Sequence, residues 1–215
     1  MPSVVLLHGI WNPAWWLLPL ARRLRREGFE VQLFGYNGAL AGPDAAVQAL
    51  VRYLGRLGGG PVSLVGHSLG GLVALEAARR GAPGVEKIVC LGSPLLGSAA
   101  ARALCGHRGC AWLLGRSRAL LLEGVAPWTG KAAVGMIAGR RAAGLGRLFA
   151  DLGESDGTVA LAETRLPGLA DHCVVDASHT GLTFSAEAAR RVAGFLREGR
   201  FDAGTAPGGA PRPIG

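Results

Sequence analysis

The stretch "LVGHSLGGL", residues 64–72, decides how this chain of 215 residues folds. It begins in the apolar run 61–66 and passes directly into a helical pattern, with Gly66-His67-Ser68-Leu69-Gly70 at the junction. The chain holds 35 glycines, so the pattern G-x-S-x-G carries little weight alone. Its position between a strand and a helix makes it informative, because a serine nucleophile is presented on that kind of turn.

The glycines around Ser68 have a physical reason. A serine at the tip of such a turn takes a positive φ, which costs about 1–3 kcal/mol. Strand and helix nearly touch beside it, so the positions two before and two after the serine must lack a Cβ. Gly66 and Gly70 meet this requirement, and Gly71 allows still closer packing. The Ser68 hydroxyl is then exposed at a helix N-terminus, where N–H groups favour negative charge.

Apolar strand-like runs alternate with amphipathic segments along the rest of the chain. We expect strands at 3–8, 31–36, 61–66, 87–92, 132–138 and 173–177, and helices at 13–27, 44–57, 69–80 and 186–198. Strands that are apolar throughout and separated by helices predict an α/β fold, with a mostly parallel doubly wound sheet of about six strands. We expect one domain over 1–201 with a small helical cap insertion at 98–130, and a disordered Gly/Pro-rich tail at 202–215.

Composition narrows the function classes. The formal net charge is +8, but no aromatic residues interleave with the basic ones, which argues against nucleic acid as a partner. Weak contact with a membrane surface stays open. We see neither a signal-peptide pattern nor an apolar run of 18 residues, so a cytoplasmic location is the expectation.

The four cysteines indicate no metal centre. Cys90 and Cys173 lie in apolar runs and are predicted to be buried thiols. Cys105 and Cys110 flank His107 in "CGHRGC", but no second pair completes a zinc site. Whether Cys105 and Cys110 are bonded to each other stays open.

A serine hydroxyl needs a base to remove its proton and a third group to orient that base. His179 in "DASHTGL" follows the last strand at its carboxyl end, where sites of open parallel sheets lie, whereas His172 precedes that strand. The orienting acid is expected between serine and histidine in chain order. We predict Ser68, Asp156 and His179 as the catalytic residues, with Glu154 as the alternative acid in "ESDGTV".

An oxyanion hole needs two preorganised N–H donors. Leu69 follows the nucleophile and supplies one, and Ile10 in "LLHGIWNP" is predicted to supply the other, with Gly9 allowing its peptide to turn inward. Trp11 adjoins this loop, and the insertion brings Trp112 and Trp128. We expect these three tryptophans to contact an apolar substrate.

Together the motifs "LLHGI", "VGHSLGG", "CLGSPLLGS", "SDGTV" and "SHTGL" resemble those of the α/β-hydrolase superfamily, and within it small bacterial lipases and esterases. The resemblance implies hydrolysis of small-molecule or lipid esters through an acyl-serine intermediate, with no cofactor. The chain is short for the superfamily, which implies a small lid or none and favours soluble esters.

Three other functions stay open at this stage. The same residues could serve a thioesterase, an amidase or a deacylase of lipid-linked glycans. The fold could also be kept by a non-catalytic binding module, or the charge could serve binding to nucleic acid or a membrane surface. The sequence does not reveal acyl length, alcohol moiety or oligomeric state.

Overall fold

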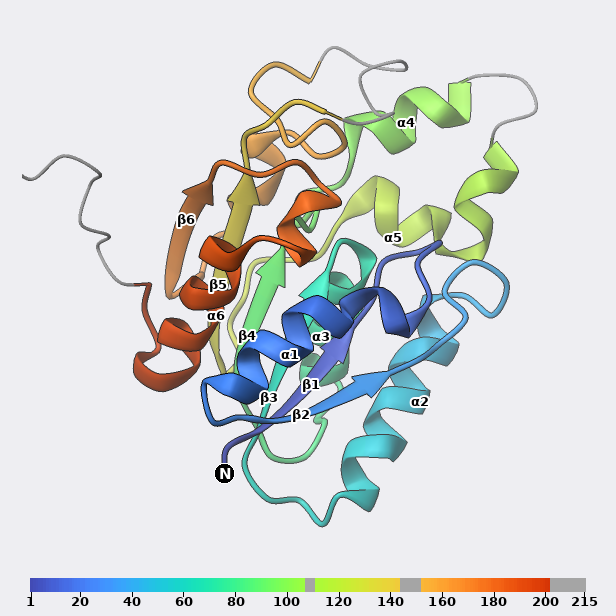
Figure 1. Cartoon of the computed structure of the whole chain (residues 1–215). Coiled ribbons are helices and arrows are strands. Elements are labelled where there is room, and N and C mark those ends of the chain that lie inside the picture. Colours follow the sequence, from blue (N-terminus) through green and yellow to red (C-terminus); the bar gives the residue numbers. More distant parts are fainter. Residues whose placement is uncertain (107–110, 144–151, 202–215) are drawn as a thin grey trace, which may run out of the picture.

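Six parallel strands form one sheet at the centre of the protein, in the order β2-β1-β3-β4-β5-β6 (Figure 1). The structure is a computed structural model, and it describes residues 1–106, 111–143 and 152–201. The strands are β1 (Ser3–Leu7), β2 (Glu30–Phe34), β3 (Val62–His67), β4 (Val85–Leu91), β5 (Ala133–Gly139) and β6 (Asp171–Val175). All five neighbouring pairs are parallel, which confirms the predicted α/β class and strand number.

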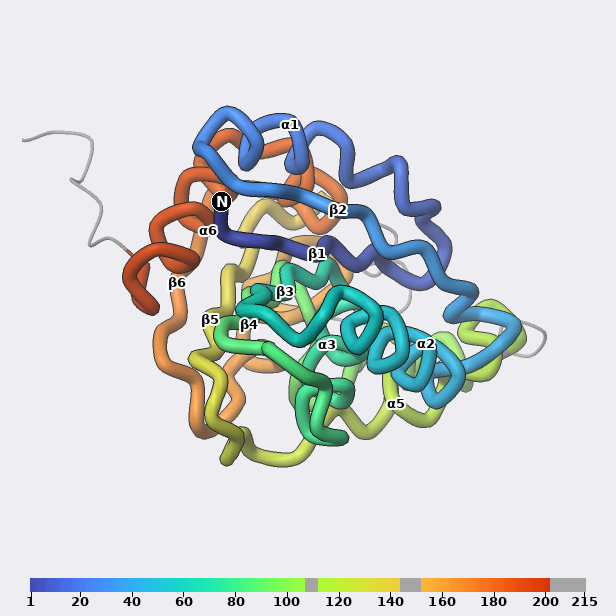
Figure 2. The backbone as a smooth tube through the Cα atoms, turned by 90° about the horizontal axis from the view of Figure 1, so that it is seen from below, coloured from blue at the N-terminus to red at the C-terminus, as the bar shows by residue number. Residues whose placement is uncertain are grey.

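Helices cover both faces of the sheet (Figure 2). On one face lie α1 (Leu18–Arg26) and α6 (Ala186–Glu198), which contact each other. On the other face lie α2 (Pro43–Arg56) and α3 (Leu69–Arg79). The strands are apolar because neither face of the sheet meets water.

Alternate side chains of each strand enter two separate cores. In β1, Val4 and Leu6 pack with the α1 and α6 side, whereas Val5 and Leu7 pack with the α2 and α3 side. All four are fully buried. This alternation is the period of two expected for strands, and it clamps the central strand between two helical layers.

The expected helix at 13–27 is divided in two. Residues Ala14–Leu17 form the short 3-10 helix η1, and α1 begins only at Leu18. Pro19 lies in the first turn of α1, where a missing N–H group costs no helical hydrogen bond. The proline therefore favours a new helix start at this point over one continuous helix.

The order of the strands creates a crevice. From β1 the chain moves outward to β2, and β3 then returns to the opposite side of β1. The connections after β1 and β3 therefore diverge at their carboxyl ends, which is where open α/β sheets bind ligands. His8 and Ser68 begin these two connections.

Three helical segments stand between β4 and β5, within the expected insertion at 98–130. They are α4 (Ala99–Gly106), the 3-10 segment η2 (Ala111–Ser117) and α5 (Arg118–Glu123). In Figure 1, α4 lies beyond the carboxyl ends of the strands. The expected tail at 202–215, His107 and Cys110 fall outside the described residues. Within 1–106, 111–143 and 152–201, no helix combines the length and apolar character needed to cross a membrane.

Substitution of Gly66 by alanine is predicted to be strongly destabilising. A Cβ at Gly66 would meet the Gly70 carbonyl carbon and the Gly71 nitrogen at 2.3 Å, and backbone cannot move away cheaply. We expect Gly66→Ala to lower the free energy of unfolding by about 3 kcal/mol or more, measured by urea denaturation. Gly55→Ala is the matched control, because nothing lies near Gly55 in α2; it should leave stability equal or raised by up to about 1 kcal/mol. Equal effects of the two changes would contradict this account.

Candidate active site

Ser68 has the strained backbone that the turn between β3 and α3 requires. Its φ is 55° and its ψ is −122°, and no other non-glycine residue in the described part of the chain has a positive φ. The Ser68 N–H donates to the Leu91 carbonyl of β4 at 2.8 Å. A Cβ at Gly70 would lie 2.5 Å from the Leu7 carbonyl oxygen, so α3 starts in direct contact with the end of β1. The serine is therefore held where strand, helix and neighbouring strand meet.

Leu69 is the first residue of α3, and the first N–H groups of a helix have no partner within it.

Across the crevice, the His8 ring fixes the conformation of the loop after β1. The Tyr36 N–H donates to His8 Nε2 at 3.2 Å, so Nδ1 carries the proton and donates to the Gly9 carbonyl at 2.7 Å. That carbonyl and the Ile10 N–H belong to one planar peptide, so the bond fixes the direction of both.

Asp156 is a buried carboxylate held by its own loop. Its side chain is 1% exposed, and Oδ1 accepts the N–H groups of Thr158 at 2.9 Å and Val159 at 2.8 Å. The other oxygen, Oδ2, lies 2.8 Å from His179 Nδ1. The backbones of these two residues are also bonded, because the His179 N–H donates to the Asp156 carbonyl at 2.9 Å. Glu154, the alternative acid, is exposed.

Gly92, at the end of β4, makes room for this carboxylate–imidazole pair. Its φ is +54°, and a Cβ there would lie 3.0 Å from Asp156 Oδ2 and 3.2 Å from His179 Nδ1. Any larger residue would press on the hydrogen bond between the two side chains. Gly92 belongs to the motif "LGSPLLGS", but the sequence alone does not show which side chains it faces.

Ser68 and His179 line the same pocket, which has a volume of about 510 Å³. Ile10 and Trp11 also line it, so the β1 loop faces the serine across the cavity. His172 lies at the start of β6, where its Nε2 is 2.8 Å from Thr164 Oγ1. It is therefore separated from His179 by the length of that strand.

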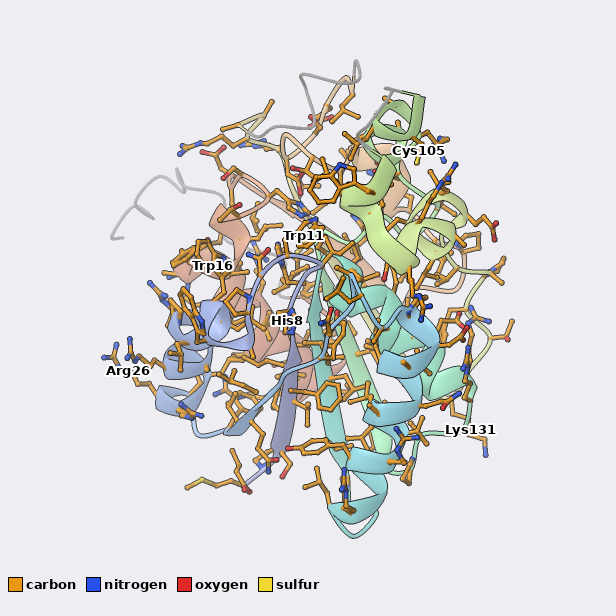
Figure 3. The ribbon with its side chains drawn as sticks, turned by 90° about the vertical axis from the view of Figure 1, so that its right-hand side faces the viewer. His8, Trp11, Trp16, Arg26, Cys105 and Lys131 are labelled. Atoms are coloured by element: carbon orange, nitrogen blue, oxygen red, sulfur yellow. The ribbon has the colours of Figure 1, made fainter. Side chains whose placement is uncertain are left out.

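The structure brings only one of the three tryptophans to the pocket. Trp11 is 54% exposed at its mouth, and in Figure 3 it lies between His8 and the helical segment that carries Cys105. Trp112 is exposed and is not among the lining residues. Trp128 is buried away from the cavity, donating Nε1–H to the Ala132 carbonyl at 2.9 Å beneath the Arg79 guanidinium. The lining of this pocket therefore gives no support to the expected substrate contacts of Trp112 and Trp128.

The inner wall of the pocket is apolar and comes mostly from the insertion. Its members are Ala100, Ala101, Leu104, Leu113, Leu114 and Leu121, whereas Asn12, Ser98, Thr158 and Thr180 supply polar groups. No cluster of three or more metal-ligating side chains occurs within 1–106, 111–143 and 152–201.

A buried glutamate connects the insertion to the loop of Asp156. Glu163 Oε2 accepts the Ala160 N–H at 2.9 Å, and Oε1 accepts the Ala99 N–H at the start of α4. Arg102 lies 3.7 Å from the same carboxylate. Burial raises the pKa of Glu163.

No feature of the sequence indicated the contact that His67 makes. This residue is 3% exposed, and its Nε2 lies 2.9 Å from the His179 carbonyl oxygen. Burial, followed by the nearby His179, lowers the pKa of His67 to about 3. Histidine within the motif was visible in the sequence, but its contact 112 residues away was not.

The chain belongs to the alpha/beta hydrolase family, whose sequence profile matches residues 4–207. It is similar to a carbendazim hydrolyzing esterase of Nocardioides sp. (strain SG-4G), with 33% identity over 100 residues. That match spans 42% of this chain and 41% of the relative, so the chain covers less than half of the length of this curated protein.

Solved structures share the fold. The mature form of the Bacillus licheniformis lipase BlEst2 superposes with a TM-score of 0.70 at 20% identity, covering 91% of each chain. The type II thioesterase BorB of the borrelidin biosynthetic cluster superposes with a TM-score of 0.58 at 19% identity, covering 92% of this chain and 90% of BorB. A lipase and a thioesterase therefore share this fold, and at these identities the likeness concerns the fold alone.

The buried state of His67 predicts a pH dependence of stability. The unfolded chain binds a proton at His67 below pH 6.5, whereas the folded chain does so only near pH 3. The buried neutral His67 therefore contributes fully to the free energy of unfolding above pH 6.5. This contribution is lost as the pH falls toward 3, and the free energy of unfolding then decreases by up to about 1.4 kcal/mol per pH unit. Urea unfolding between pH 7.5 and 4.5 should show a shallower slope for His67→Gln than for the wild type. Parallel curves would contradict the prediction.

Proposed function

We propose that this protein is a serine hydrolase that cleaves carboxylic esters through an acyl-serine intermediate. The Ser68 hydroxyl attacks the ester carbonyl carbon while His179 Nε2 takes the hydroxyl proton. Asp156 orients the imidazole through Nδ1 and stabilises its cation. The N–H groups of Ile10 and Leu69 bind the oxygen that becomes negative.

Collapse of the tetrahedral intermediate breaks the bond to the leaving alcohol, and His179 returns the proton to that alcohol. A water molecule then gives a proton to His179 and attacks the acyl carbon. The second intermediate collapses to the carboxylic acid, and the proton returns to Ser68. Atoms and charge balance without a cofactor in this cycle.

The observation that carries the proposal is that Ser68 and His179 line one and the same cavity, with the imidazole bonded to Asp156 at 2.8 Å. With Nδ1 engaged by the carboxylate, Nε2 is the nitrogen left for the serine proton. The fixed Gly9–Ile10 peptide, whose carbonyl accepts from His8, supports the oxyanion role of Ile10.

The pocket favours esters with an apolar acyl or alcohol group, because its wall is made of alanine and leucine side chains. The esterase relative and the lipase-like fold agree with this class. The thioesterase neighbour makes thioesters the second candidate. Paired oxygen esters and thioesters of one acyl group decide between them by kcat/KM.

Ser68→Ala should abolish ester hydrolysis and labelling by a fluorophosphonate, because no other group in the proposed cycle can carry the acyl chain. Hydrolysis of p-nitrophenyl butyrate and gel detection of the label check this. Circular dichroism should show a folded variant, since the change removes one hydroxyl group and leaves the backbone of the turn as it is. Undiminished turnover would refute Ser68 as the nucleophile.

Asp156→Asn should lower kcat by about 10⁴-fold, because an amide cannot hold the same imidazole tautomer. Glu154→Gln is the matched control two residues away, and its exposed side chain should leave kcat within about twofold. A silent Asp156→Asn with a crippled Glu154→Gln would reverse the assignment of the acid.

Ala101→Phe should shorten the accepted chain, since Ala101 lines the pocket and is 5% exposed. A ring there would occupy volume otherwise open to an acyl or alkyl group. We expect kcat/KM for p-nitrophenyl octanoate to fall at least about tenfold relative to the acetate. Ala45→Phe, on the exposed side of α2, should leave that ratio unchanged, and an unchanged ratio in Ala101→Phe would exclude this wall from the acyl site.

A further inference from the structure

His67 stands directly before Ser68 and is bonded to the residue proposed as the base. Its Nε2 lies 2.9 Å from the His179 carbonyl oxygen. A carbonyl only accepts, so Nε2 carries the proton and donates. The other nitrogen, Nδ1, is then a lone-pair acceptor, and it is buried without a hydrogen-bond partner among the described residues.

The backbone of His179 is consequently held at both of its polar groups. Its N–H donates to the Asp156 carbonyl, and its C=O accepts from His67. The imidazole is held a third time, by Asp156 Oδ2. Two of these contacts come from Asp156, the proposed acid, and the third comes from the turn between β3 and α3 that carries Ser68.

The bond to His67 crosses two strands of the sheet. His67 ends β3 and His179 follows β6, with β4 and β5 between them. Within the part of the chain that the structure describes, β6 is an edge strand that pairs with β5 alone, and the loop after it has no neighbouring strand on its outer side. A tether from β3 therefore fixes this loop relative to Ser68, which neither β5 nor Asp156 does directly.

We propose that His67 is a positioning residue that sets the distance and direction of the His179 imidazole relative to the Ser68 hydroxyl. This inference rests on the proposed function. Proton transfer needs close heavy-atom contact, and a misplacement of about 1 Å can cost roughly 100-fold in rate. The chain thus uses the residue beside its nucleophile to locate its base.

A neutral donor suits this position. The His67 and His179 rings lie 4.8 Å apart between centroids, so a positive charge on His67 would oppose the imidazolium that forms during turnover. The charged or titratable groups near His67 are His179, Asp156 and His8, and burial dominates over all of them in keeping its pKa low. His67 therefore supplies an N–H group without a charge.

The experiment compares His67→Phe, which has no donor, with His67→Gln, whose amide N–H reaches a similar distance. We expect His67→Phe to lower kcat for p-nitrophenyl butyrate about 10- to 100-fold with KM within about twofold, and to slow fluorophosphonate labelling equally. His67→Gln should restore kcat to within about threefold of the wild type. A role in folding alone would lower the amount of active protein and would not separate the two folded variants.

His172→Phe is the matched control, because it removes another partly buried histidine and its bond to Thr164 at the far end of β6. Its kcat should equal that of the wild type. Where His67→Phe does not fold, His67→Asn replaces it, since its shorter amide falls short of the carbonyl, and the same contrast with His67→Gln is expected.

Equal kcat in wild type and in the donor-less variant overturns the inference while the proposed function stands. Equal losses in His67→Gln and His67→Phe also overturn it. A wild-type protein inert to both esters and fluorophosphonate defeats the proposed function itself, and this result is distinguishable because no variant is needed to see it.

Discussion

The near-contact of β3 and α3 is the constraint on which the rest of the structure depends. At Gly66 the helix backbone comes so close that a Cβ would meet it at 2.3 Å, and at Gly70 the end of β1 is almost as near. The chain reverses direction within this space, and Ser68 takes the resulting positive φ. Because Gly66 and Gly70 have no side chains, the strand and the helix can approach closely enough to hold Ser68 at the crevice.

The parallel sheet turns this local constraint into a site. Each of β1, β3, β4, β5 and β6 ends at the same edge, and each contributes one part there: the His8–Ile10 loop, Ser68, Gly92, Asp156 and His179. The side chains come from stretches separated by up to 171 positions, yet strand order makes them neighbours. Two buried histidines then fix backbone groups, His8 at the Gly9 carbonyl and His67 at the His179 carbonyl.

The sequence predicted what periodicity and chain order determine. Apolar strands alternating with helices gave the six-stranded α/β sheet, and the rule that parallel strands end at one edge separated His179 from His172. The division of the first helix was missed because the periodic pattern continues through Pro19. Trp128 was expected near the pocket because it lies in the insertion, whereas the structure buries it with its indole N–H donating to the Ala132 carbonyl. The His67 contact joins residues far apart in the chain, and no local pattern encodes it.

Glu163 has a consequence for how the insertion can move. Its carboxylate bonds the first turn of α4 through Ala99 and the Asp156 loop through Ala160, while its carbonyl accepts the Leu96 N–H at 2.9 Å. These three hydrogen bonds connect the start of the insertion to the segment that carries Asp156. A rigid-body movement of α4 would therefore also displace the segment that carries Asp156, so the position of this helix and the position of that carboxylate are coupled.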